Sequence, residues 1–144
     1  MSSLVDVLNK QVADWNVLFV KLHNFHWYVK GPGFFTLHTK FEELYTEAAL
    51  HIDVLAERAL AIKGKPLATM KEYLEVSSIK EAKGNESADE MVKEIADDFT
   101  TILSDLKNGI ELAEAAGDNR TADLFISMYD GLEKHVWMLT AYLG

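Results

Sequence analysis

Four side chains between residues 26 and 57 have types and spacings that could hold a transition metal. His26 and His38 flank a Gly-Pro-Gly turn at residues 31–33, and Asp53 and Glu57 stand four residues apart. Imidazole nitrogens and carboxylate oxygens, with coordination positions left open, are the ligands of non-haem iron sites. The chemistry they suggest is therefore the binding and oxidation of a metal ion. A second interpretation stays open, in which the histidines are simply hydrogen-bonded and the acids form a solvated helix face.

The two histidines should be positioned by two long helices. Apolar residues recur every three or four positions over 4–29, and His26 continues that stripe, so its side chain should lie on the buried seam. A second helix is predicted over about 35–62. The glycines and proline at 31–33 should end the first helix and reverse the chain. Long helices joined by a short loop pack as an antiparallel hairpin, which would place His26 and His38 at the same level.

The second half of the chain predicts another helical hairpin. A capping box formed by Ser87 and Glu90 begins a third helix, and Asp118 or Asn119 caps a fourth. The segment 64–86 between the hairpins indicates a long crossover that contains a brief helix. The predicted fold is all-α, a ferritin-like four-helix bundle with a short helix in the crossover between its second and third helices.

The spacing of His38 and Asp53 excludes a shared metal within one chain. They are fifteen residues apart, which is roughly 22 Å of straight helix at about 1.5 Å per residue, whereas metal–ligand bonds are about 2 Å. His38, Glu42, Asp53 and Glu57 nevertheless fall on one flank of the second helix. A second chain packed antiparallel across a two-fold axis near residues 45–46 would bring its carboxylates opposite His38. We therefore predict two sites per dimer, each shared by both chains.

Composition indicates a single acidic domain. The chain has 144 residues, and 23 acidic against 14 basic side chains give a formal net charge of −9, which repels nucleic acid and anionic lipid. It contains no cysteine, so disulfides and thiolate metal sites are excluded and a reducing cytosol is suitable. It shows neither a signal-peptide pattern nor an apolar run long enough to span a bilayer. We expect one domain over residues 1–144, located in the cytoplasm, with no membrane partner.

Several stretches resemble one known family. FHWYVKGPGFFTLHTKFEELY followed by HIDVLAERALAIKGKP is similar to the Dps family, the mini-ferritins or DNA-binding proteins from starved cells. The segments GDNRTADLF and LEKHVWML resemble the same family. The resemblance implies a twelve-subunit cage of ferritin-like bundles with dinuclear iron centres at its two-fold interfaces. Iron(II) would be oxidised there by hydrogen peroxide, more slowly by oxygen, and stored as a ferric core.

The same resemblance implies roles for the candidate ligands. His26 and His38 from one subunit, with Asp53 and Glu57 from its neighbour, would bind the iron. Glu42 would be a further acidic ligand that supports the second iron. Ordinary ferritin-like sites use Glu-x-x-His pairs inside one bundle, and the sequence contains no such pair. The site would therefore lie at the interface and not in the bundle core.

Other residues have a weaker connection to this chemistry. The indole of Trp27 could donate an electron, although interfacial packing would equally explain it. Asp118 and Asp123 resemble family residues that line acidic three-fold pores for iron, but they also suit an N-cap and a first helical turn. The remaining histidines should be surface or packing residues: His23, His51 and His135.

The resulting expectation is a ferroxidase, an oxidoreductase that stores iron and protects against oxidative stress. Two alternatives stay open. One is a non-enzymatic helical bundle whose histidines and acids are structural, and the other is a DNA-condensing cage. Direct DNA binding is not expected, because no lysine-rich tail is present and twelve chains of charge −9 would carry −108 formal charges.

Overall fold

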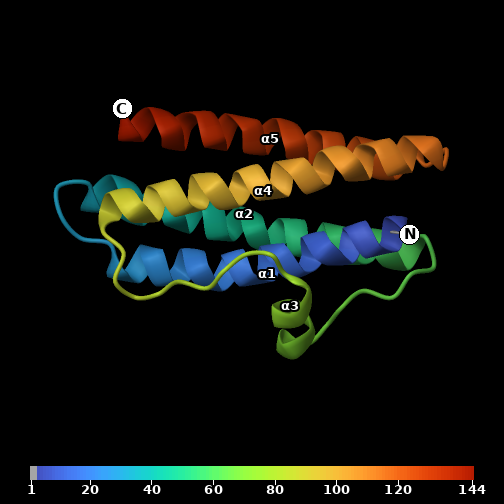
Figure 1. Ribbon diagram of the computed structural model, residues 1–144, viewed down its shortest axis with the longest axis horizontal. Coiled ribbons are helices and arrows are strands. Elements are labelled where there is room, and N and C mark those ends of the chain that lie inside the picture. The colour runs from blue at the N-terminus through green and yellow to red at the C-terminus, as the bar shows by residue number, and fades with distance from the viewer. Residues whose placement is uncertain (1–2) are drawn as a thin grey trace.

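The computed structural model describes residues 3–144, so the first two residues of the expected domain lie outside it. The described chain forms five helices and contains no strand (Figure 1). They are α1 (Leu4–Tyr28), α2 (Phe34–Ala61), α3 (Met70–Val76), α4 (Ala88–Ala115) and α5 (Asn119–Leu143). The predicted all-α fold is confirmed, and each predicted helix boundary lies close to the observed one.

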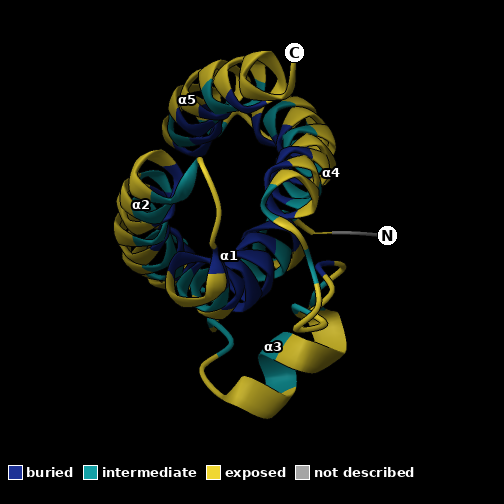
Figure 2. Ribbon diagram, turned by 90° about the vertical axis from the view of Figure 1, so that its left-hand side faces the viewer, coloured by how far each residue is buried: buried dark blue, intermediate teal, exposed yellow. Residues whose placement is uncertain are grey.

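The four long helices form two antiparallel hairpins packed side by side. α1 pairs with α2 and α4 pairs with α5, while the crossover runs back along α1 and carries α3 on the outside of the bundle (Figure 1). Viewed along the bundle axis, the buried residues of the long helices turn inward and the exposed residues turn outward (Figure 2). None of the helices in residues 3–144 is long and apolar enough to cross a bilayer.

Each long helix contributes a large aromatic side chain to the core. Trp15 of α1, Phe41 of α2, Phe99 of α4 and Phe125 of α5 are completely inaccessible to solvent. This follows from apolar residues recurring every three to four positions, which gives each helix one buried stripe. The stripe predicted for α5 ends earlier than expected, because Leu143 is exposed in the last turn.

The helix ends follow local sequence signals. The side chain of Ser87 accepts a hydrogen bond from the Glu90 amide and Glu90 reciprocates, which forms the predicted capping box. Asp118 caps α5 by accepting from the Thr121 amide. Gly117 adopts a φ of 72° after α4, a conformation that only glycine adopts without strain.

A buried carboxylate on α1 attaches the part of the crossover that directly follows α3. The side chain of Asp14, fully buried on α1, accepts hydrogen bonds from the Ser77 hydroxyl at 2.7 Å and from the Ser78 amide at 2.9 Å. Lys10 pairs with the same carboxylate at 2.7 Å and with Asp105 of α4 at 3.0 Å. Because α3 itself has no buried residue, we infer that this cluster helps to set the path of the crossover.

Candidate metal centre

His26 and His38 lie side by side near the turn that joins α1 to α2. The Nδ1 of His26 contacts the backbone carbonyl oxygen of His38 at 2.6 Å, and the Nδ1 of His38 contacts that of His26 at 2.7 Å. The antiparallel hairpin thus places the two histidines at the same level, as the spacing predicted. Each side chain is held by the backbone of the other residue.

These two contacts decide the tautomer of both rings. A carbonyl oxygen can only accept a hydrogen bond, so each Nδ1 carries the proton and donates it. Each Nε2 of the neutral rings is then an unprotonated nitrogen whose lone pair is available to a metal. An Nδ1–H bonded to a backbone carbonyl is the usual outer-shell arrangement of a metal-binding histidine, and it fixes the orientation of the ring.

Packing holds the rings in place. The two imidazoles stack with their centroids 3.7 Å apart and their planes 13° apart, and the ring of Phe34 stacks on His38 at 4.9 Å. His26 is buried, whereas His38 is half-buried at the surface of α2. The pair is therefore ordered before any ligand arrives.

Glu42 is the candidate acid that reaches these histidines within one chain. It follows His38 by one helical turn, and its Oε1 lies 3.9 Å from the Nε2 of His26. Most of its side chain is exposed to solvent. A carboxylate oxygen beside a free imidazole nitrogen can share a cation with it.

Asp53 and Glu57 lie further along α2, and both are exposed. Neither makes a hydrogen bond or an ion pair within residues 3–144. Across the same residues, no three histidine, aspartate or glutamate side chains gather closely enough to hold a metal ion. One chain therefore pairs His26 with His38 and places Glu42 near the first of them, and it leaves the two other predicted ligands facing solvent.

Trp27 follows the candidate ligand His26 in the sequence, but unlike His26 it is not buried. Its indole is 67% exposed, and its ring lies 5.3 Å from that of His23. Such exposure is compatible with either predicted role, electron donation or interfacial packing.

The predicted pore residues differ in what they contact. Asp118 accepts hydrogen bonds from Thr121 and from the guanidinium of Arg58 at 3.0 Å. Partial burial opposes ionisation, but these hydrogen bonds outweigh it and hold the pKa of Asp118 below its ordinary value. Asp123 is exposed. The structural role predicted for Asp118 is thus confirmed, and a role in a pore stays a prediction.

A second polar cluster, partly buried between α2 and α5, was not predicted. The Nε2 of His135 on α5 donates to the Oε2 of Glu47 on α2 at 2.8 Å, and the Nε2 of His51 lies 3.9 Å from the same oxygen. The hydrogen bond from His135 lowers the pKa of Glu47 in spite of its partial burial, and burial lowers the pKa of His51. The four-residue spacing of Glu47 and His51 was visible in the sequence. The partner on α5 was not, because it lies 88 positions away.

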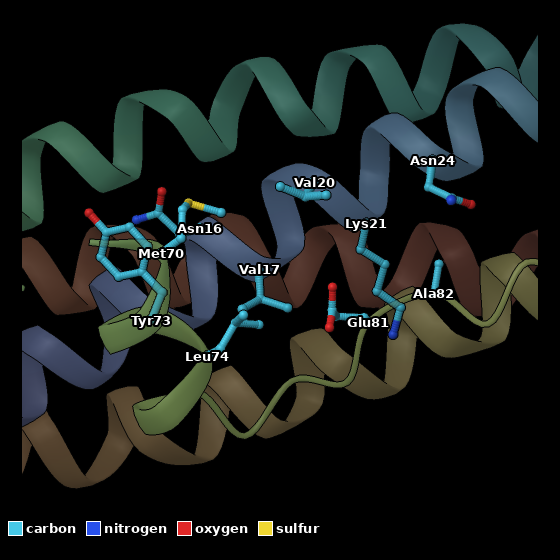
Figure 3. A pocket seen from close by; sticks show the side chains of 10 residues that line it. All are labelled: Asn16, Val17, Val20, Lys21, Asn24, Met70, Tyr73, Leu74, Glu81 and Ala82. Atoms are coloured by element: carbon cyan, nitrogen blue, oxygen red, sulfur yellow. The ribbon is translucent and has the colours of Figure 1, made fainter. Parts of the chain in front are cut away.

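A cavity of about 120 Å³ lies elsewhere, between α1 and the crossover (Figure 3). Its walls include Val17, Met70 and Leu74, with Lys21 and Glu81 at one side. The amine of Lys21 pairs with Asp98 of α4 at 2.8 Å. None of the candidate metal ligands lines this cavity.

Comparisons with known proteins agree with the ferritin-like fold. A family model described as a ferritin-like domain matches residues 5–144. The chain is 60% identical over 141 residues to general stress protein 20U of Bacillus subtilis, covering 98% of this chain and 97% of that protein. It is 64% identical over 141 residues to DNA protection during starvation protein 2 of Bacillus anthracis, with the same coverage of both.

Solved structures give the same result. The crystal structure of Dps from Staphylococcus aureus has a TM-score of 0.97 and 52% identity, covering 100% of this chain and 99% of that one. The crystal structure of a Dps protein from Bacillus brevis has a TM-score of 0.95 and 55% identity, covering both chains completely. These matches span the whole bundle, including the hairpin that carries the paired histidines. The chain therefore belongs to the Dps family of ferritin-like proteins.

Proposed function

We propose that the protein oxidises iron(II) with hydrogen peroxide at sites shared by two subunits. His26 and His38, with Glu42, come from one subunit, and Asp53 and Glu57 come from its neighbour. Oxygen would be a slower oxidant. The observation that carries this proposal is the reciprocal bonding of the two Nδ1–H groups to backbone carbonyls, because it leaves the Nε2 of each neutral ring without a proton, and the Nε2 of His26 lies 3.9 Å from a Glu42 carboxylate oxygen.

The arrangement suits a two-electron reaction. Two iron(II) ions give one electron each to hydrogen peroxide, which takes up two protons and forms two molecules of water. The iron leaves as iron(III), and no hydroxyl radical is released. Imidazole and carboxylate ligands would hold both ions where the peroxide can reach them.

Assembly is a condition of this activity. Because Asp53 and Glu57 stand roughly 22 Å or more along α2 from His38, a monomer would offer only part of the ligand set. We propose a dodecameric cage in the cytoplasm that stores the iron(III) product, with Asp118 and Asp123 near pores that admit iron(II). Removal of iron(II) and peroxide together would protect the cell against oxidative stress.

The double variant His26→Ala with His38→Ala tests the proposal. Stopped-flow absorbance should show loss of fast peroxide-dependent iron oxidation, and anaerobic titration should show loss of about two bound irons per interface site. The matched control is Thr39→Ala, an exposed residue beside His38 on α2. Circular dichroism and size-exclusion chromatography should show unchanged helix content and assembly in both variants. Oxidation at the wild-type rate in the double variant would reject the assignment in favour of a non-enzymatic bundle.

A DNA-condensing cage is the second candidate, and the names of several relatives refer to DNA protection. We propose that any protection by this chain acts through iron and peroxide and not through direct binding. Its formal net charge of −9 repels the phosphate backbone. A gel shift at low salt without metal checks this, and clear retardation of DNA would favour the condensing cage.

A further inference from the structure

Tyr45 contacts the candidate iron site through the ring of His26. The two rings meet edge to face, with centroids 5.4 Å apart and planes 85° apart. The ring of Tyr45 also stacks on His23 at 3.7 Å and 18°. Edge-to-face and stacked arrangements of this kind are favourable aromatic contacts. They hold the half-buried phenol against one of the two paired histidines.

Trp27 has a less direct connection to the same site. Its ring contacts His23 at 5.3 Å, and no aromatic contact joins it to His26 or His38 within the described chain. His23 in turn stacks on Tyr45. The rings thus form a series from Trp27 through His23 and Tyr45 to His26, and Tyr45 is the oxidisable side chain next to the site.

The surroundings of Tyr45 suit the loss of an electron together with a proton. Its hydroxyl makes no hydrogen bond within residues 3–144, so no group of the same chain holds its proton. The Nδ1–H of His23 donates to the Phe19 carbonyl at 2.8 Å. That bond fixes the imidazole against which the phenol stacks.

We propose that Tyr45 supplies one electron through His26 when the site holds a single iron(II). This inference rests on the proposed ferroxidase function. Hydrogen peroxide needs two electrons and two protons to form two waters. Iron(II) gives one electron, Tyr45 gives the second together with its hydroxyl proton, and solvent gives the other proton. The products are iron(III), a tyrosyl radical and two waters. Without the tyrosine, the same single iron would leave hydroxide and a free hydroxyl radical.

The variant Tyr45→Phe tests the proposal, since it removes the redox-active hydroxyl and keeps the stacked ring. The intact assembly is loaded with one iron(II) per interface site, mixed with hydrogen peroxide and freeze-quenched for electron paramagnetic resonance. The wild type should give a radical whose spectrum narrows when its tyrosines carry deuterated rings. In Tyr45→Phe that signal should be lost, and hydroxyl-radical spin-trap adducts should rise several-fold. With two irons per site, the oxidation rate should be unchanged.

Two further variants complete the test. Tyr73→Phe is the matched control, because Tyr73 lies on α3 and its hydroxyl bonds to the Leu67 carbonyl, and it should keep the radical. A radical that persists in Tyr45→Phe but disappears in Trp27→Phe would overturn the proposal. Fast iron oxidation without any wild-type radical would also overturn it. Absence of fast oxidation in the wild type would instead reject the proposed ferroxidase function.

Discussion

Replacing Asp14 by alanine should loosen the crossover while leaving the long helices in place. The carboxylate is fully buried and accepts hydrogen bonds from the Ser77 hydroxyl and the Ser78 amide. A hydrogen bond to a charged group contributes about 1.5–3 kcal/mol. The lower part of that range applies to each serine contact, because Ser78 is exposed and water can replace the lost acceptor. Lys10 retains Asp105 as a partner.

We therefore expect local opening of the crossover to become easier by about 1.5–3 kcal/mol. Since about 1.4 kcal/mol corresponds to a factor of ten, amide exchange in the segment 77–79 should accelerate by roughly 10- to 100-fold. Hydrogen–deuterium exchange measured by mass spectrometry on the native assembly would report this directly. Exchange within α4 and α5 should stay unchanged.

Two comparison variants make the reasoning refutable. Asp14→Asn retains an acceptor oxygen for the Ser78 amide and should have a smaller effect. Asp105→Ala removes the other partner of Lys10 without touching the crossover, and should leave the exchange of 77–79 unchanged. If Asp14→Ala does not accelerate that exchange, or if Asp105→Ala accelerates it equally, the buried carboxylate is not what holds the crossover.

The remaining predictions concern single acids. The hydrogen bond from His135 lowers the pKa of Glu47 below its ordinary value of about 4.5, so its stabilising contribution is present above that value and is lost as pH falls through the lowered pKa. Glu47→Gln should therefore make acid unfolding below about pH 4.5 less steep in circular dichroism, and an unchanged profile would contradict this. Glu42→Gln should weaken the binding of one of the two iron(II) ions by roughly 10- to 100-fold in anaerobic titration. Wild-type affinity for both ions would remove Glu42 from the ligand set. Asp123→Asn should slow iron uptake without altering stability, whereas Asp118→Ala, which removes the cap, should also destabilise α5 by about 1 kcal/mol in thermal unfolding. Equal uptake by Asp123→Asn would leave that acid without a pore role.

Local signals accounted for most of the fold. The apolar stripes identified the faces of the long helices, because a period of 3.6 residues leaves one side of each helix to be buried. The capping box at Ser87 and Glu90 and the cap at Asp118 were predictable because a cap is satisfied by residues within three positions. The stripe of α5 was extended too far, since Leu143 lies in the final turn, where no facing helix covers it.

The candidate site was only partly predictable. Spacing alone indicated that His26 and His38 stand at the same level and that Asp53 is out of reach, because both conclusions need only the rise of a helix and the position of a turn. The role of each ligand came from resemblance to a family. That role stays a prediction until iron binding is measured.

Other features depended on tertiary structure. Each of His26 and His38 donates a hydrogen bond to the backbone of the other, and Glu47 pairs with His135. Both arrangements depend on how far each helix is rotated and shifted against its neighbour. So does the attachment of Ser77 to Asp14. Periodicity leaves that rotation and shift free within about one residue, whereas a hydrogen bond tolerates only a few tenths of an ångström. The sequence thus defined which side chains could take part, and the packing of the helices decided which of their atoms meet.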